Sequence, residues 1–376
     1  MNSFSTIQKE LLPLLQQAEK RRRVYRFFKV MNSLLLQFIL LLGISIPLFV
    51  YLFSSKLPKW FEAIQNKDLW HFSPQLYMLL FWGFFFFFMM LSRSQKAKYG
   101  TIEKQIIRAV IGKIAPTFKF DEHKQINPKV IAESELISTH QLRFKKATKV
   151  NSVYNLSRGI LSGKVSNTSI TMGAVKTLNH SGNSYFMYVP GLNYLYIIYN
   201  YIRPWFSKKH TLEQVGSQFL GMFAIVEFNK NFNGTTIILP DQFEKRIGYL
   251  AKTIQSLNIS GNQLVNLEDT EFENEFVVYS SDQVEARYVM STSLMQRITR
   301  LKKKIGKPIM LSFKNNKLYF AVYHPYGFLR LNESKNLITS NALELLYEDI
   351  VNAIGIVEDL NLNTKIWKNV STTKSV

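Results

Sequence analysis

The side chains that could carry out chemistry are scattered in this 376-residue chain. It has no cysteines, which excludes disulfides, thiolate metal sites and cysteine nucleophiles. No two of the six histidines stand at the i, i+4 spacing of a metalloprotease zinc site. Nucleophile-elbow, Walker and dinucleotide-binding motifs do not occur either. The sequence therefore predicts no catalytic, cofactor-binding or metal-binding residues, and the protein is not expected to be an enzyme.

Two groups of charged residues near position 280 need an interpretation. The first group lacks the glycine and the ligand spacing of a calcium loop, so it predicts a solvated turn before a strand. Its members are Glu268, Asp269, Glu271, Glu273 and Glu275. The second group is Asp282, Glu285 and Arg287. It predicts a helix capping box from Asp282 to Glu285 with a surface ion pair to Arg287. The alternative is a recognition surface for a partner.

A tyrosine-rich stretch, Tyr185–Trp205, is uncharged up to Ile202. It predicts either a hairpin packed on a sheet or a loop that lies at the bilayer interface or against a partner. In the second case the contact residues would be Tyr194, Tyr196, Tyr199, Tyr201, Arg203 and Trp205.

Two apolar segments near the N-terminus indicate that the chain is attached to a membrane. Met31–Phe53 is uncharged over 23 residues, about 34 Å as a helix and enough to span a bilayer. Leu76–Leu91 is shorter and can be completed at its N-terminal end by Ser73, Pro74 and Gln75. Basic residues flank the pair on the outer sides, at Lys20, Arg21, Arg22, Arg23, Arg26, Lys29, Arg93, Lys96, Lys98, Lys104 and Arg108. The positive-inside rule then predicts a two-pass protein of the inner (cytoplasmic) membrane with both termini in the cytoplasm.

The remaining pattern predicts an α+β fold. After Pro116, short β-branched and aromatic runs alternate with helical stripes, which favours a mainly antiparallel sheet with several helices. The expected strands are 154–165, 169–177, 219–228, 235–239, 276–279, 309–313 and 318–322, and the expected helices are 242–257, 292–305 and 342–360. Asn315 and Asn316 predict a hairpin turn, because asparagine tolerates positive φ.

The expected organisation has six parts. They are a cytoplasmic N-terminal helix (1–30), transmembrane helix 1 (31–53), an external loop (54–75), transmembrane helix 2 (76–92), a stalk helix (93–115) and a cytoplasmic α+β domain (116–376). The formal net charge of +21 is either a by-product of a lysine-rich composition or an attraction to a polyanion. Because a membrane protein meets lipid first, we expect contact with anionic lipid and not with nucleic acid.

Four stretches of the chain resemble a bacterial family known only as domain of unknown function 3137. They are Gly221–Asp241, Asp269–Ile298, Ile309–Val322 and Ile356–Trp367, and Lys9–Leu15 before the hairpin also resembles that family's layout. The chain departs from the family between Gly182 and Lys209. The resemblance implies an inner-membrane-anchored protein with a cytoplasmic domain and a LemA-type membrane protein as partner. It implies no reaction.

Two functions of different classes fit these observations. The first is a membrane-anchored scaffold or sensor, facing the cytoplasm, that binds a protein partner through its α+β domain. The alternative is a ligand-gated membrane effector, whose soluble domain binds a small molecule and whose hairpins form a homo-oligomer. An enzyme whose site these motifs miss stays as a third reading.

Overall fold

The structure is a computed structural model that describes residues 4–53, 74–137, 158–178, 217–228, 233–241, 261–360 and 362. Within its helices, the side chains at 36 and 39–82 lie outside the described residues. The chain divides into two compact units. The sheet unit comprises Met1–Ile7, Ile107–Asn332 and Ala342–Val376, and the helical unit comprises Gln8–Ile106 and Glu333–Asn341.

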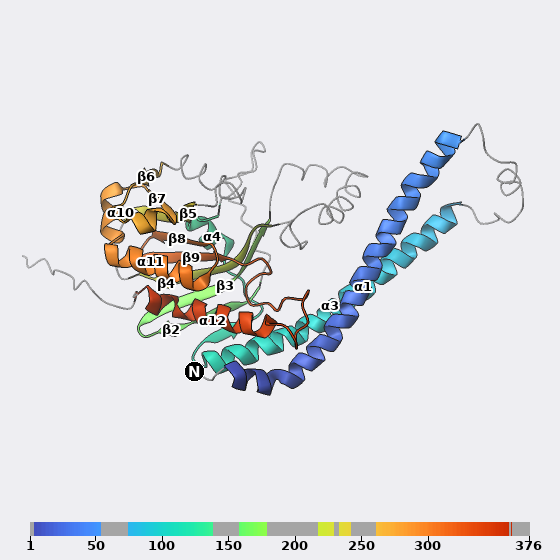
Figure 1. Cartoon of the computed structure of the whole chain (residues 1–376), viewed down its shortest axis with the longest axis horizontal. Coiled ribbons are helices and arrows are strands. Elements are labelled where there is room, and N and C mark those ends of the chain that lie inside the picture. Colours follow the sequence, from blue (N-terminus) through green and yellow to red (C-terminus); the bar gives the residue numbers. More distant parts are fainter. Residues whose placement is uncertain are drawn as a thin grey trace, which may run out of the picture. The chain divides into compact units, whose positions relative to one another are not determined.

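Two long helices provide most of the helical unit. They are α1 (Phe4–Phe53) and α3 (Pro74–Ile114), coloured blue and cyan in Figure 1. They run antiparallel and touch through aromatic pairs, with ring centroids 6.4 Å apart for Tyr25 and Tyr99 and 6.2 Å apart for Phe28 and Phe88. The helical conformation expected for 31–53 and 76–92 is therefore confirmed.

Among the residues that the structure describes, no helix is long and apolar enough to cross a membrane. The part of the predicted external loop at 54–73 lies outside the described residues.

A single sheet organises the sheet unit (Figure 1). In the described ranges its nine strands follow the order β1-β2-β3-β4-β9-β8-β5-β7-β6, and every neighbouring pair is antiparallel. The strands are β1 (Lys119–Asp121), β2 (Ile160–Val165), β3 (Thr168–Leu178), β4 (Ser217–Glu227), β5 (Thr235–Pro240), β6 (Gln263–Val265), β7 (Phe276–Ser280), β8 (Ile309–Lys314) and β9 (Lys317–Tyr323). The prediction of an α+β fold with a mainly antiparallel sheet is confirmed.

Two backbone features fix the centre of this sheet. The β8–β9 hairpin turns through Asn315 and Asn316, both at positive φ (52° and 57°), as the sequence predicts. Between β4 and β9 the backbones approach closely at Gly221, where a Cβ would collide with the carbonyl oxygen of Val322. Only glycine fits there without a shift of the backbone.

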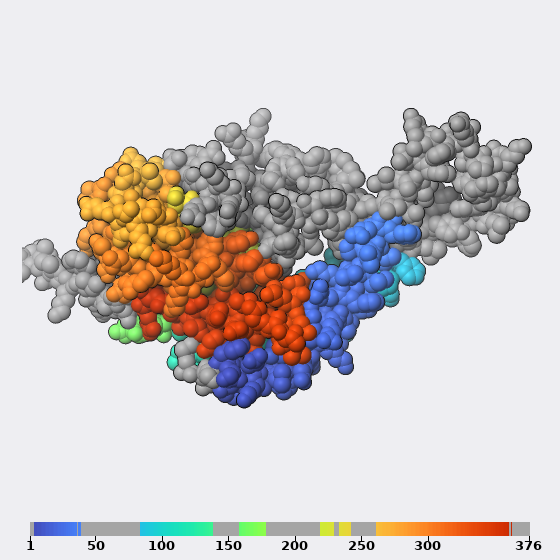
Figure 2. Space-filling model, in the orientation of Figure 1, coloured from blue at the N-terminus to red at the C-terminus, as the bar shows by residue number. Residues whose placement is uncertain are grey.

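Helices cover both faces of the central strands. They are α4 (Pro128–Glu133), α9 (Thr270–Glu273), α10 (Gln283–Val289), α11 (Thr292–Ile305) and α12 (Ala342–Asp359). On one face Tyr319 and Phe223 pack with Ile131 of α4 in a buried cluster. The other face lies under α11 and α12, which form the orange and red surface in Figure 2. The α11 bounds match the prediction, and the predicted helix 242–257 lies outside the described residues.

Candidate functional site

Asp282 is the N-cap residue of α10, as the capping-box interpretation expects. Its Oδ1 accepts hydrogen bonds from the backbone N–H groups of Val284 (2.8 Å) and Glu285 (3.0 Å). These bonds satisfy donors that the first turn of the helix leaves open. Asp282 therefore starts the helix that carries the other two predicted residues.

Glu285 does not complete a capping box. The backbone N–H of Asp282 donates to Ser280 Oγ (3.2 Å), while the Glu285 carboxylate reaches away from α10. Its two oxygens accept the N–H groups of Asn233 (2.6 Å) and Gly234 (2.5 Å). A Cβ at position 234 would lie too close to this carboxylate, so a larger residue there would make the Glu285 side chain shift. Glu285 thus ties the start of β5 to α10, a role that its sequence neighbours do not reveal.

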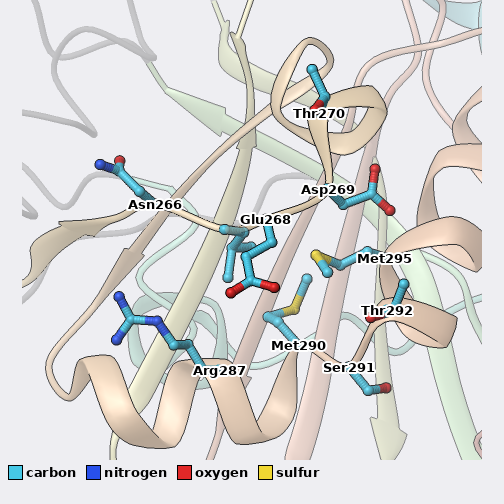
Figure 3. Close-up of a pocket in the computed structure, with 10 residues that line it drawn as sticks. Asn266, Glu268, Asp269, Thr270, Arg287, Met290, Ser291, Thr292 and Met295 are labelled. Carbon is cyan, nitrogen blue, oxygen red and sulfur yellow. The ribbon is translucent and has the colours of Figure 1, made fainter.

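Arg287 lines a hollow of about 610 Å³ beside α10 and α11 (Figure 3). The lining residues are Asn266, Leu267, Glu268, Asp269, Thr270, Arg287, Met290, Ser291, Thr292 and Met295. In Figure 3 the thioethers of Met290 and Met295 lie at the centre, and Glu268, Asp269 and Arg287 lie around them. Both methionines are buried. An apolar floor with charges of both signs suits a small amphipathic group or a side chain of a partner.

The acidic group beside this hollow precedes β7 and is largely exposed, as the sequence predicts, but it forms the four-residue helix α9 and takes part in ion pairs. Asp269 caps α9 by accepting the N–H of Phe272 (3.0 Å). Glu271 pairs with Lys303 of α11 (2.6 Å), and Glu275 pairs with Lys302. The Glu271–Lys303 pair is exposed, whereas the less exposed Glu275–Lys302 pair links the start of β7 to α11. In the part of the chain that the structure describes, no group of three His, Asp or Glu side chains could hold a metal ion.

A second charged cluster lies at the end of β9. Asp349 of α12 accepts from Lys307 Nζ (2.6 Å) and contacts Nδ1 of the buried His324 (3.2 Å). Burial alone raises the pKa of the Asp349 carboxyl, but His324 and Lys307 outweigh burial and lower it. The three residues come from three separate elements, so no spacing in the sequence could have indicated them.

The helical unit contains a third cluster, built on α1. Glu19 and Arg22, only 2% and 5% exposed, stand at i, i+3 and form a bidentate pair. Arg22 Nε and Nη2 each lie 2.7 Å from a Glu19 oxygen. Arg23 adds a further bond to Glu19 at 3.0 Å. Because both charged groups are removed from water, their remaining hydrogen-bonding capacity has to be met by the protein.

Segment 333–341 meets that remaining capacity. The backbone N–H of Leu337 donates to Glu19 Oε2 (3.0 Å), and Arg22 Nη1 donates to the Glu333 carbonyl (3.0 Å). Burial alone raises the pKa of the Glu19 carboxyl. The bonds from Arg22, Leu337 and Arg23 overcome this and lower the pKa to about 2, from 4.5. The buried pair thus fixes the position of residues more than 300 positions away in the sequence.

Two outer contacts complete this arrangement. Arg26 Nη1 donates to the Ser334 carbonyl (2.9 Å), and Lys29 Nζ pairs with the Glu333 carboxylate (2.9 Å). Burial alone lowers the pKa of Lys29, but the Glu333 charge and Tyr25 raise it, so Lys29 stays charged at neutral pH. From the sequence alone, Arg26 and Lys29 are recognisable only as cations that flank an apolar segment.

The other predicted contact residues, Tyr194, Tyr196, Tyr199, Tyr201, Arg203 and Trp205, lie outside the described residues.

Comparison with known proteins identifies one region. Residues 217–362 match the model of the family described as Protein of unknown function (DUF3137). The resemblance to that family is confirmed for these residues. No curated protein and no solved structure matches the chain. The DUF3137 region begins at the first residue of β4 and contains α10, the hollow, the His324 cluster and segment 333–341. It leaves out α1, α3 and β1–β3.

Proposed function

We propose that this chain is a membrane-anchored scaffold or sensor of the inner (cytoplasmic) membrane. α1 and α3 would cross the bilayer as a two-pass hairpin over 31–53 and 76–92, with both termini in the cytoplasm. The α+β domain would bind a protein partner, and a membrane protein of the LemA type is the partner that the family resemblance suggests.

The observation that carries the anchoring is a set of large apolar side chains that the helical unit leaves exposed. Within the two proposed membrane segments these side chains are 52–73% exposed. They are Leu34, Phe38, Phe84, Phe86, Phe87 and Met90. Exposure of these side chains to water is unfavourable, whereas acyl chains would cover them. Cations flank the set on both helices, at Arg26 and Lys29 and at Arg93 and Lys96, where phospholipid headgroups would lie.

The proposed role as scaffold or sensor draws support from segment 333–341. This segment joins β9 to α12 in sequence, yet it packs in the helical unit through Glu19 and Arg22. A change that a partner imposes on β9 or α12 could therefore pass along the chain to segment 333–341, which is hydrogen-bonded to α1. The mixed apolar and charged lining of the hollow near Arg287 would suit such a partner.

Topology reporters on the full chain test the anchoring. Fusions after Asn32 and after Gly100 should report from the cytoplasm, and a fusion near Gln65 should report from the external side. A fusion after Val376 should again report from the cytoplasm. An external signal at Val376 would refute the cytoplasmic placement of the α+β domain.

The hollow also favours the second candidate, a ligand-gated effector. Its volume and its buried methionine floor would admit a small amphipathic molecule. A thermal-shift screen of the detergent-solubilised chain tests this reading. A ligand that stabilises the natural chain but not a Met295→Trp variant, which fills the hollow, would support it. An equal shift for both chains would rule the hollow out as the binding site.

A further inference from the structure

Three cations on one face of α1 converge on the same two residues. Arg22, Arg26 and Lys29 stand at i, i+4 and i+7, so their side chains project from one side of the helix. Arg22 and Arg26 donate to the carbonyl groups of Glu333 and Ser334, and Lys29 pairs with the Glu333 carboxylate. Apart from the Glu19 carboxylate, which pairs with Arg22, one carboxylate and two neutral carbonyls thus contact these three cations.

The outer two cations differ from the inner one in accessibility. Arg22 is buried and already paired with Glu19, whereas Arg26 is exposed and Lys29 is nearly half exposed. An acceptor from outside the chain could therefore reach Arg26 and Lys29 without breaking the Glu19–Arg22 pair.

The depth of these cations follows from the helical rise. If the membrane segment starts at Met31, Lys29 lies about 3 Å outside it, Arg26 about 7.5 Å and Arg22 about 13.5 Å, for a helix along the bilayer normal. Each headgroup layer is roughly 5–8 Å thick. Lys29 and Arg26 are then at the level of lipid phosphates, and Arg22 is beyond it.

We infer that Arg26 and Lys29 form a binding site for the phosphate of an anionic phospholipid, which segment 333–341 occupies in this structure. This inference rests on the proposed membrane anchoring. Glu333 and the Ser334 carbonyl take the places of phosphate oxygens. A phosphate would replace the neutral carbonyl on Arg26 with a charge-assisted acceptor. The exposed pair that it displaces at Lys29 is of a kind that contributes little stability. Anionic lipid therefore loosens the segment at its 333–334 end. Because this segment belongs to the DUF3137 region, the lipid composition of the membrane would change the contacts of that region.

Amide hydrogen exchange of the full-length chain in lipid nanodiscs tests whether lipid phosphate replaces segment 333–341 at Arg26 and Lys29. One set of discs contains phosphatidylcholine alone, and the other contains phosphatidylcholine with phosphatidylglycerol. Peptides covering 333–341 should exchange roughly two- to five-fold faster in the anionic discs, which is the factor that the loss of an exposed ion pair gives. Equal or slower exchange in the anionic discs would overturn the inference.

Matched variants show whether Arg26 and Lys29 are the site. In the double variant Arg26→Gln with Lys29→Gln, the peptides covering 333–341 should exchange at the same rate in both kinds of disc. The control, Arg93→Gln with Lys96→Gln on α3, should keep the difference between the discs. If both variants keep it, the lipid acts elsewhere and the assignment of the site is wrong.

Two further measurements distinguish lipid phosphate from free phosphate, and the lipid site from the membrane anchoring on which it rests. Inorganic phosphate added to phosphatidylcholine discs should leave the exchange unchanged, because it is not concentrated at the membrane surface. If it reproduces the effect, the site binds free anions and the lipid assignment fails. A chain that does not enter the discs contradicts the membrane anchoring itself. A chain that enters them but shows no lipid effect contradicts only the lipid site.

Discussion

Many phenylalanines of the sheet unit are buried, whereas several of the helical unit are exposed. In the sheet unit the side chains of Phe219, Phe223, Phe272, Phe276, Phe313, Phe320 and Phe328 are at most 2% exposed. In the helical unit those of Phe27, Phe38, Phe84, Phe86 and Phe87 are 52–60% exposed. The sheet unit covers its own apolar surface with helices, as a water-soluble domain does. The helical unit leaves many of its phenylalanine side chains exposed. The same residue type is therefore part of a core in one unit and part of the surface in the other.

The largest expected effect separates the two kinds of phenylalanine. Phe223→Ala should destabilise the sheet unit by about 3–5 kcal/mol, because it leaves a cavity beside Tyr319. Phe86→Ala should cost much less in detergent, about 1 kcal/mol or below, because about half of its side chain is already exposed. Thermal unfolding of the detergent-solubilised variants measures both values. Similar losses for the two variants would contradict the contrast.

The buried ion pair of the helical unit should give the next largest effect. Arg22→Ala leaves Glu19 buried and without its main partner, which costs about 3 kcal/mol or more in comparable cases. We expect segment 333–341 to come away from α1, and its amides to exchange faster. Arg21→Ala, at an exposed neighbouring position, is the matched control and should have no effect. Slow exchange of 333–341 in the Arg22 variant would show that the pair does not hold this segment.

Acid should weaken the same contact with a defined sign. The pKa of Glu19 is about 2 in the folded chain and 4.5 ordinarily, so its contribution is complete above pH 4.5 and is lost as the pH falls toward 2. That contribution is on the order of 3 kcal/mol. The exchange rate of the Leu337 amide, corrected for its intrinsic pH dependence, should rise across this window in the natural chain. A Glu19→Gln variant should lack this rise, and an identical rise in both chains would assign it to another group.

The smallest of these effects concerns the link between α10 and β5. Glu285→Gln removes the charge that accepts the Asn233 and Gly234 amides, and we expect a loss of about 1–3 kcal/mol. Glu344→Gln, at an exposed position on α12, is the control and should be neutral. Chemical denaturation followed in the sheet unit measures both. If the two variants behave alike, Glu285 is a solvated surface residue.

Local pattern predicted most strands but not their order. Runs such as 235–239 and 309–313 lie within β5 and β8, because β-branched and aromatic residues fit a half-buried pleated surface. The position of β5 between β8 and β7 depends on pairings between distant residues, which leave no local signature. The three-residue strands β1 and β6 are too short to show a period, and α10 has too few apolar positions to form a stripe.

The clusters were harder to predict than the elements for the same reason. Arg22 and Lys29 are visible in the sequence as flanking cations, but their partner Glu333 is about 300 residues away. Asp282 was predictable as a cap because its bonds go to the next three residues. Glu285 was not, because its bonds go to amides some 50 residues earlier. A hydrogen bond between residues close in the sequence could be predicted, whereas one between distant residues could not.

The position of β4 has a practical consequence for anyone who expresses a fragment. A fragment cut at the family boundary would start at Ser217 and would lose β3, whose pairing with β4 runs from Ile170 opposite Val226 to Leu178 opposite Ser217. The long strand β4, interior in the whole chain, would become an open edge rich in apolar residues. Such edges pair with other molecules, and the fragment would also lack the core residues Ile126, Ile131 and Val175, so we expect it to aggregate. A fragment that begins before Lys119 keeps β1–β3 and avoids that edge.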